Sequence, residues 1–216
     1  KQLTFHQAGD QVESWSWDSE KIYFTSGRFN RISSFSIPIT GGTPKRLFGH
    51  YHNNVHNLIE HPSSKEFFFN ESWESFNFPQ RKGYKGSFNP DIKSYETDSK
   101  TFTKLTNWEG KDIWPTISKD GSLYFVSDEF NGEYNLYTLE NGNPKQLTSF
   151  NTSVKYPKVS ANGEVIVFEK DYQLFTYEVV SGKTKMIPIS IFQNNTLAQS
   201  QSFDISGNIT NVDVSV

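Results

Sequence analysis

The sequence predicts an all-β protein, specifically a β-propeller with four-stranded antiparallel blades. Three observations support this fold class. Aromatic residues make up 16% of the 216-residue chain, and such residues favour pleated strands, whereas alanine, the best helix former, is scarce. Short aromatic strands recur, each after a polar turn. The anchors of a closing strand also recur along the chain, at intervals close to those of propeller blades.

The aromatic strands are the clearest repeat. They are IYFTS at 22–26, FFFNES at 67–72, LYFVSD at 123–128 and VIVFEK at 165–170. The polar turns before them are DSEK, PSSK, KDGS and ANGE. The Asp-Gly and Asn-Gly pairs of the last two turns suit tight hairpins, because glycine adopts a positive φ at little cost. We expect these segments to be the second strand of each blade.

The other strands follow from the same alignment. Inner strands are expected at 12–17, 56–61, 113–118 and 154–160, and alternating third strands in RISSFSIPI, PDIKSYE, YNLYTLE and YQLFTYEVV. The closing strands are anchored by Leu3, Leu47, Leu105, Leu147 and Met186, which lie 44, 58, 42 and 39 residues apart. The long interval is explained by an insertion around residues 73–90. A β-sandwich also has frequent turns, but it has no reason to repeat the same turn and closing strand.

We therefore expect one partial propeller over residues 1–216, with about four complete blades and partial blades at both ends. The blades are expected at about 5–48, 49–107, 108–149 and 150–190, with a connection over 187–207 and the start of a further blade at 208–216. The chain would then be a fragment of a larger propeller. An open arc would expose unpaired blade faces, which predicts dimerisation or aggregation and makes a homo-oligomer possible.

Composition excludes several classes of function. The formal net charge is −3 and the basic residues are scattered, which is unlike a nucleic-acid-binding protein. No apolar run reaches the length of a membrane span, so we expect no membrane insertion. Cysteine is absent, which excludes disulfides and thiolate chemistry. The composition leaves the compartment open between cytoplasm and a bacterial periplasmic or secreted location.

Motifs for catalysis and cofactors are also missing from the sequence. It has no G-x-S-x-G nucleophile elbow, no phosphate-binding glycine loop and no dinucleotide fingerprint. We therefore expect no cofactor and no catalytic residue in this chain. The carboxylate pairs Asp128–Glu129 and Glu71–Glu74 are expected to be exposed at the ends of second strands. A glycosidase would need two carboxylates that face each other, and this alternative stays open.

Four histidines gather at His50, His52, His56 and His61. His52 and His56 have the spacing that zinc enzymes use on a helix, but they fall on or near an expected strand, where side chains repeat every two residues. We interpret the group as polar loop and channel-lining side chains and expect no metal. A metal site would need at least three of them to converge.

The recurring aromatic residues have two interpretations. They are packing between blades, which their regular position favours, or stacking on sugar rings. The residues concerned are Tyr23, Phe24, Phe68, Phe69, Tyr124, Phe125, Ile166 and Phe168.

The insertion contains the candidate binding residues. Its segment FPQRKGYKGSFNP places Arg81, Lys82 and Lys85 around Tyr84, between two prolines. A compact basic and aromatic loop suits an anionic group such as the terminal carboxylate of a peptide. We predict peptide binding by these four residues; the alternative is a solvated loop that caps one blade.

The segments GGTPKRL, KLTNWEGKD and LYFVSDEFNGEYNLYTLENGNPKQLTSF resemble the repeats of TolB-type propellers. The insertion and its blade, RKGYKGSFNPDIKSYETDSKTFTKLTNWEGKD, resemble more specifically the N-terminal propeller of tricorn-like serine proteases. The tail NITNVDVSV is similar to the stretch where the first propeller of those proteins gives way to the second. The resemblance covers nearly the whole chain.

The resemblance implies a six-bladed propeller within a large peptidase, whose catalytic residues lie in other domains. The expected function is a non-catalytic propeller that guides or gates peptide substrate or product and supports assembly. Its expected partners are peptides or proteins and the remaining domains of the parent peptidase. The alternatives are a stand-alone TolB-like protein-interaction propeller and a carbohydrate-binding or glycosidase propeller.

Overall fold

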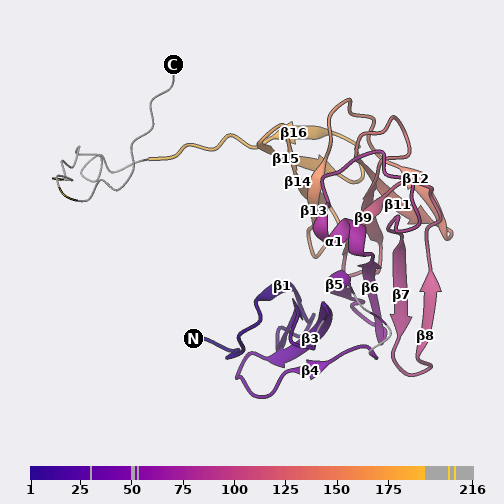
Figure 1. Ribbon diagram of the computed structural model, residues 1–216. Helices are drawn as coiled ribbons and strands as arrows, with labels where there is room; N and C mark the ends of the chain where they lie inside the picture. Colours follow the sequence, from indigo (N-terminus) through magenta and orange to yellow (C-terminus); the bar gives the residue numbers. More distant parts are fainter. Residues whose placement is uncertain (30, 50–51, 53, 193–203, 205–206, 208–216) are drawn as a thin grey trace.

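The computed structural model describes residues 1–29, 31–49, 52, 54–192, 204 and 207. Over this part of the chain, four four-stranded antiparallel sheets stand around a common axis (Figure 1). Each sheet is a meander in which consecutive strands pair. This confirms the predicted propeller architecture with four complete blades. Most of the predicted connection 187–207 lies outside the described residues, and so does all of the predicted next blade 208–216.

The blades are numbered in chain order. Blade 1 consists of β1 (Asp10–Trp15), β2 (Lys21–Ser26), β3 (Ser33–Pro38) and β4 (Lys45–Arg46). Blade 2 consists of β5 (Val55–Glu60), β6 (Glu66–Glu71), β7 (Ile92–Glu96) and β8 (Thr101–Lys104). Blade 3 consists of β9 (Asp112–Ile117), β10 (Leu123–Ser127), β11 (Asn135–Glu140) and β12 (Asn143–Gln146). Blade 4 consists of β13 (Lys155–Val159), β14 (Val165–Lys170), β15 (Gln173–Glu178) and β16 (Thr184–Met186).

The inner strands β1, β5, β9 and β13 meet in sequence, each in contact with the next. Each is also the edge strand of its own sheet. This explains how β9 and β13 tolerate Pro115 and Pro157, since proline cannot donate a ladder hydrogen bond and is confined to edges and bulges. The inner edges of all four blades therefore line the axis.

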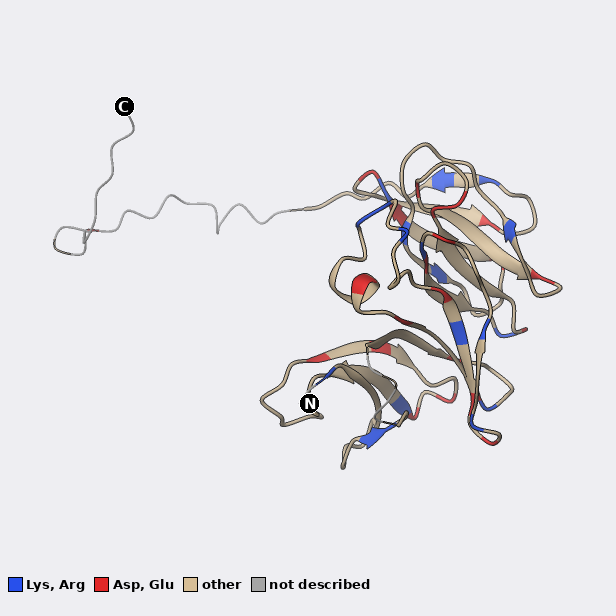
Figure 2. Ribbon diagram, turned by 45° about the vertical axis from the view of Figure 1, so that its right-hand side comes forward, with Lys and Arg blue, Asp and Glu red and all other residues tan. Residues whose placement is uncertain are grey.

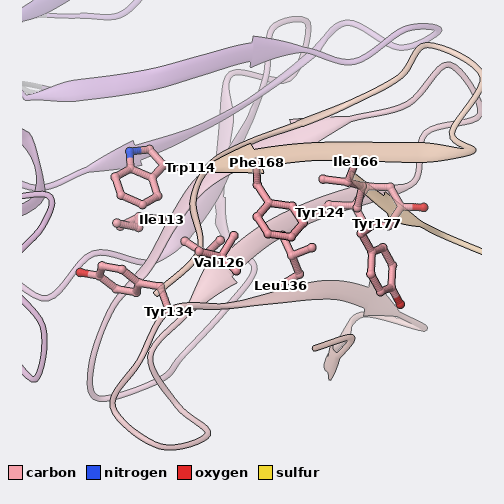
Figure 3. Close-up of a cluster of buried hydrophobic side chains, with 10 residues drawn as sticks. Ile113, Trp114, Tyr124, Val126, Tyr134, Leu136, Ile166, Phe168 and Tyr177 are labelled. Carbon is pink, nitrogen blue, oxygen red and sulfur yellow. The ribbon is translucent and has the colours of Figure 1, made fainter. Parts of the chain in front are cut away.

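Apolar side chains fill the spaces between blades. Between blades 3 and 4, Tyr124, Val126 and Leu136 pack against Ile166, Phe168 and Tyr177 (Figure 3). Alternate residues of β10 point the other way, where Leu123 and Phe125 pack against blade 2. The recurring aromatic residues of the second strands are all buried, which confirms their interpretation as packing residues.

Asn70 in β6 links blade 2 to blade 3 by hydrogen bonds. Its fully buried side-chain amide donates to the carbonyls of Asp91 and Asp112, at 2.9 and 2.8 Å. Its carbonyl oxygen accepts from the Trp114 N–H at 3.2 Å and from the Asn57 amide at 3.0 Å. Every hydrogen-bonding position of this amide is used, which is what burial of a polar group requires.

The insertion contains the one helix of the described residues, the short α1 (Trp73–Asn77). It was not predicted. The Ser72 hydroxyl caps it by accepting from the N–H groups of Glu74 and Ser75, the usual role of serine at this position. None of the described helices is long and apolar enough to cross a membrane.

A buried ion pair fixes α1 to blade 3. Glu74 and Lys111 are both fully buried, with Lys111 Nζ 2.7 Å from Glu74 Oε2. Lys111 Nζ also donates to the Phe78 carbonyl at 2.7 Å, and Arg81 Nε lies 2.8 Å from Glu74 Oε1. Burial lowers the pKa of Lys111, although the Glu74 carboxylate opposes the shift.

Asp128 provides a second attachment. It is buried and accepts from Trp108 Nε1 at 2.7 Å, from the Lys111 N–H at 2.9 Å and from the Gly83 N–H at 3.1 Å. The expectation that Glu74 and Asp128 are exposed acids was therefore wrong. Both carboxylates have a cation or N–H donors from a segment distant in the sequence, which compensates for their burial.

We predict that Asn70→Ala lowers the free energy of unfolding by about 2–4 kcal/mol, because it leaves several buried donors and acceptors without partners. Urea unfolding measures the change. The matched control is Asn143→Ala, whose side chain is exposed and which should change stability by less than about 0.5 kcal/mol. Equal stabilities of the two variants would contradict the assigned role of Asn70.

We predict that Lys111→Met destabilises the protein by about 3 kcal/mol, because it leaves the buried Glu74 carboxylate without its closest cation. The double variant Glu74→Leu/Lys111→Met should recover part of the loss, since no unpaired charge remains. Urea unfolding of wild type, single and double variants tests this. A double variant that is less stable than Lys111→Met would contradict the interpretation.

Candidate functional site

Each inner strand carries a β-bulge at a corresponding place. The register shifts between Val12 and Ser14 in β1, between His56 and Ile59 in β5, and between Lys155 and Lys158 in β13. In β9 the shift lies opposite Tyr124 and Val126. A bulge places two residues opposite one and redirects the side chains beside it.

The bulges of blades 2 to 4 contain residues with left-handed backbone conformation. Asn57, Trp114 and Tyr156 have φ angles of 55°, 55° and 52°. Asparagine tolerates this region, but large aromatic residues rarely adopt it. Such strain persists only where the surrounding structure imposes it, and it clusters at functional sites. The three blades thus hold the same unusual backbone geometry next to the axis.

A cavity of about 340 Å³ lies where the bulges meet. Its walls include residues of all four inner strands and of α1. Those used in the argument below are Glu13, Asn57, Phe76, Trp114, Tyr156 and Lys158. Its volume lies near the lower end of the range for small-ligand pockets. We call it the axial cavity.

Two opposite charges face the axial cavity. The Glu13 carboxylate accepts from the Asn57 N–H at 2.9 Å and from the Thr25 hydroxyl at 3.1 Å, and burial raises its pKa. The Lys158 ammonium group forms no hydrogen bond or ion pair with any described residue. Lys158 is exposed, although desolvation by the cavity walls lowers the pKa of its ammonium group.

His56 and Ser75 connect the cavity wall to α1. The Ser75 hydroxyl and His56 Nε2 are 3.0 Å apart, and His56 Nδ1 lies 2.7 Å from the Asn54 carbonyl. Burial lowers the pKa of His56 to about 4, against a smaller opposite effect of the Asn54 hydrogen bond. The imidazole is therefore neutral at pH 7, with Nδ1 as donor and Nε2 as acceptor for the serine.

The described members of the histidine group, His52, His56 and His61, do not converge on one point. His52 lies beside Glu71 and stacks on Phe102, while the His61 ring accepts from the N–H groups of Ser63 and Ser64. His50 lies outside the described residues. Among the residues that are described, no three metal-ligating side chains form a group.

The basic loop of the insertion, residues 79–90, lies beside the axial cavity. Gln80 Nε2 donates to the Tyr156 hydroxyl at 2.5 Å, which joins the loop to β13. The Tyr134 hydroxyl donates to the Pro79 carbonyl at 3.0 Å. A Cβ at Gly86 would meet the Tyr84 hydroxyl at 2.3 Å, so a larger residue at this position would displace the Tyr84 ring.

All three predicted basic residues of this loop have acidic partners. Besides its contact with Glu74, Arg81 lies over the Tyr84 ring, 4.6 Å from its centroid. Lys82 pairs with Glu133, and Lys85 lies 3.4 Å from Glu109. Basic and acidic residues are interspersed over the blades (Figure 2). The structure brings Arg81 and Tyr84 together, and it places Lys82 and Lys85 against different acids.

Sequence reasoning did not find Glu13 and Lys158. One signal was available, since both belong to expected inner strands, at 12–17 and 154–160. Their inward orientation depends on the bulges, which the sequence pattern does not show.

Two buried groups should make stability depend on pH in opposite directions. His56 ionises near pH 6.5 when unfolded and near 4 when folded, so its stabilising contribution is complete above about pH 6.5 and is lost as the pH falls to 4. Burial raises the pKa of Asp112 from 3.8 to about 7, so its contribution is complete below about pH 3.8 and is lost as the pH rises to 7.

We predict that His56→Asn and Asp112→Asn expose these two trends. Relative to wild type, the unfolding free energy of His56→Asn should fall as the pH rises from 4.5 to 6.5, and that of Asp112→Asn should rise. Each slope is about 1.4 kcal/mol per pH unit at most. Urea unfolding across this range measures both. Curves parallel to that of wild type would contradict the assigned protonation states.

Comparison with known proteins supports the predicted relationship. The family model of the tricorn protease N-terminal β-propeller domain matches residues 1–183. A tricorn protease of Thermoplasma volcanium is 29% identical over 130 residues, which is 59% of this chain and 12% of that protein. The chain thus spans about an eighth of the length of that relative.

Solved structures share the fold at low sequence identity. TolB from Acinetobacter baumannii superposes with a TM-score of 0.70 at 19% identity, covering 85% of this chain and 44% of TolB. The crystal structure of the tricorn protease superposes with a TM-score of 0.56 at 14% identity, covering 89% of this chain and 24% of that one. The family match extends over most of the chain, and the chain therefore belongs to the tricorn protease N-terminal β-propeller domain family.

Proposed function

We propose that this propeller is a non-catalytic domain of a tricorn-like peptidase that guides or gates peptide substrates or products and supports assembly with the other domains. The observation that carries the proposal is the position of the basic loop. The insertion is attached to blade 3 through Glu74 and Asp128. The contact between Gln80 and Tyr156 of blade 4 holds the basic loop beside the axial cavity. A peptide that moves along the axis would pass this loop.

Within this function, Arg81, Lys82, Tyr84 and Lys85 are proposed to bind the terminal carboxylate of a peptide. The side chains of Arg81, Lys82 and Lys85 remain 48%, 41% and 53% exposed. Ion pairs of exposed side chains contribute little to stability, so a peptide carboxylate can replace Glu133 or Glu109 at small cost. Arg81 keeps its place through buried Glu74, and it orients the Tyr84 ring.

A second candidate function is a protein-interaction propeller of the TolB type. The aromatic residues Trp73, Phe78 and Phe88 favour it, because they form an exposed cluster around α1. Exposed aromatic clusters are typical of protein interfaces. The recurring aromatic strand residues give no support to a sugar-binding function, since they are buried between blades.

We predict that Lys82→Ala/Lys85→Ala weakens binding of a hexapeptide with a free carboxylate by about tenfold, because hydrogen bonds to charged groups contribute roughly 1.5–3 kcal/mol. Isothermal titration calorimetry on the 216-residue chain measures Kd. The same hexapeptide with an amidated C-terminus should bind wild type and variant alike.

The charge-matched control is Lys183→Ala/Lys185→Ala, which changes two exposed lysines at β16. It should bind the free hexapeptide as tightly as wild type. If both double variants behave as wild type, the loop does not bind the peptide carboxylate and this part of the proposal fails.

A further inference from the structure

The axial cavity contains a pair of opposite charges that do not neutralise each other. Glu13 in β1 and Lys158 in β13 belong to the first and the fourth blade. They attract each other, but neither makes an ion pair within the described part of the chain. Lys158 is exposed and Glu13 is half-buried, so a ligand that enters the axial cavity can reach both charged groups.

A zwitterionic ligand meets the requirements of both groups. The Lys158 ammonium has three donors and no described acceptor, and a carboxylate is its natural partner. The Glu13 carboxylate uses one donor at each oxygen and has lone pairs left for an ammonium group. At pH 7 a peptide with free ends carries both groups, since its α-carboxyl is ionised and its α-amine is largely protonated.

We propose that the axial cavity binds a di- or tripeptide with free termini, with its carboxylate at Lys158 and its ammonium at Glu13. The inference rests on the proposed function in that both ligands are peptides, but the site differs from the basic loop. The volume of about 340 Å³ limits the ligand to a few residues.

The walls between the two charges suit the rest of such a ligand. Trp114 and Tyr156 stand with ring centroids 4.6 Å apart, and both line the cavity together with Phe76. Aromatic rings provide large contact areas for apolar side chains and peptide planes. The positive φ angles of Trp114 and Tyr156 show that the backbone is strained where these rings enter the cavity.

The test uses the dipeptide Ala-Phe and two blocked forms, N-acetyl-Ala-Phe and Ala-Phe-amide. Titration calorimetry on the full chain should show that each block weakens binding by about tenfold, the loss of one charge-assisted contact. This measurement needs no variant and so does not depend on the folding of one. Equal affinity for free and blocked dipeptides would overturn the proposal.

Two variants assign the ends of the dipeptide. With Lys158→Met, Ala-Phe and Ala-Phe-amide should bind equally, while acetylation should still weaken binding. With Glu13→Gln, the free and acetylated forms should bind equally, while amidation should still weaken binding. Thermal unfolding verifies that each variant is folded.

The control is Lys155→Met, on the same strand as Lys158. Lys155 does not line the axial cavity and lies 3.7 Å from Glu169. The Lys155→Met variant should bind all three dipeptides as wild type does. A loss of affinity equal to that of Lys158→Met would overturn the assignment of the carboxylate to Lys158.

The outcome separates this inference from the proposed function. If the hexapeptide binds through Lys82 and Lys85 and Ala-Phe does not bind, the inference fails and the proposed function stands. If Ala-Phe binds as described and the hexapeptide is indifferent to Lys82 and Lys85, the carboxylate-binding role of the loop fails and the axial site stands.

Discussion

The buried ion pair of Glu74 and Lys111 holds the functional part of this molecule together. Both side chains are fully buried, and they join α1 of the insertion to the start of blade 3. Burying two charges is costly, and the cost is offset only when geometry and further hydrogen bonds are good. Here Arg81 and the Phe78 carbonyl provide those contacts. The ion pair thus fixes the direction in which the basic loop leaves α1.

The geometry of the axis depends on a second constraint, the bulges of the inner strands. A regular strand would alternate its side chains between the two faces of its blade. The extra residue in each inner strand breaks this alternation and brings residues such as Glu13 and Trp114 to the cavity. Because inner strands are also edge strands, each bulge disturbs only the pairing with the second strand, and the other strand pairs of the blade stay in regular register. The irregular backbone is therefore confined to the side of each blade that lines the axis.

The fold could be predicted from the sequence because its signals are local. A polar turn, an aromatic strand and a closing strand lie within one blade, and each blade repeats them. The packing role of residues such as Phe125 and Phe168 also follows from this repetition. Only the insertion interrupts this repetition. Its helix α1 was not predicted, because five residues are too few to show helical periodicity.

The site was less predictable because it is built from contacts between distant segments. Asp128 and Glu74 follow aromatic strands and have the sequence context of exposed acids. Their burial depends on partners that are distant in the sequence. For Asp128 these are the N–H groups of Lys111 and Gly83, which lie 17 and 45 residues away, and for Glu74 it is the Lys111 ammonium group. The composition of the basic loop made its residues recognisable as candidate binding residues. Their acidic partners could not be predicted, because two of them, Glu109 and Glu133, lie in other segments of the chain. The spacing of His52 and His56 was not taken as a metal signal, and in the structure the two side chains make separate contacts.

The insertion leaves blade 2 after β6 and returns at β7, where Asn70 and Ile92 are paired neighbours in the sheet. Its two ends are therefore held together by the blade itself. Closing a longer loop between fixed ends costs only about 0.6 kcal/mol for each doubling of its length. This junction is thus a natural place for evolution or protein engineering to exchange one recognition segment for another while the surrounding architecture stays unchanged.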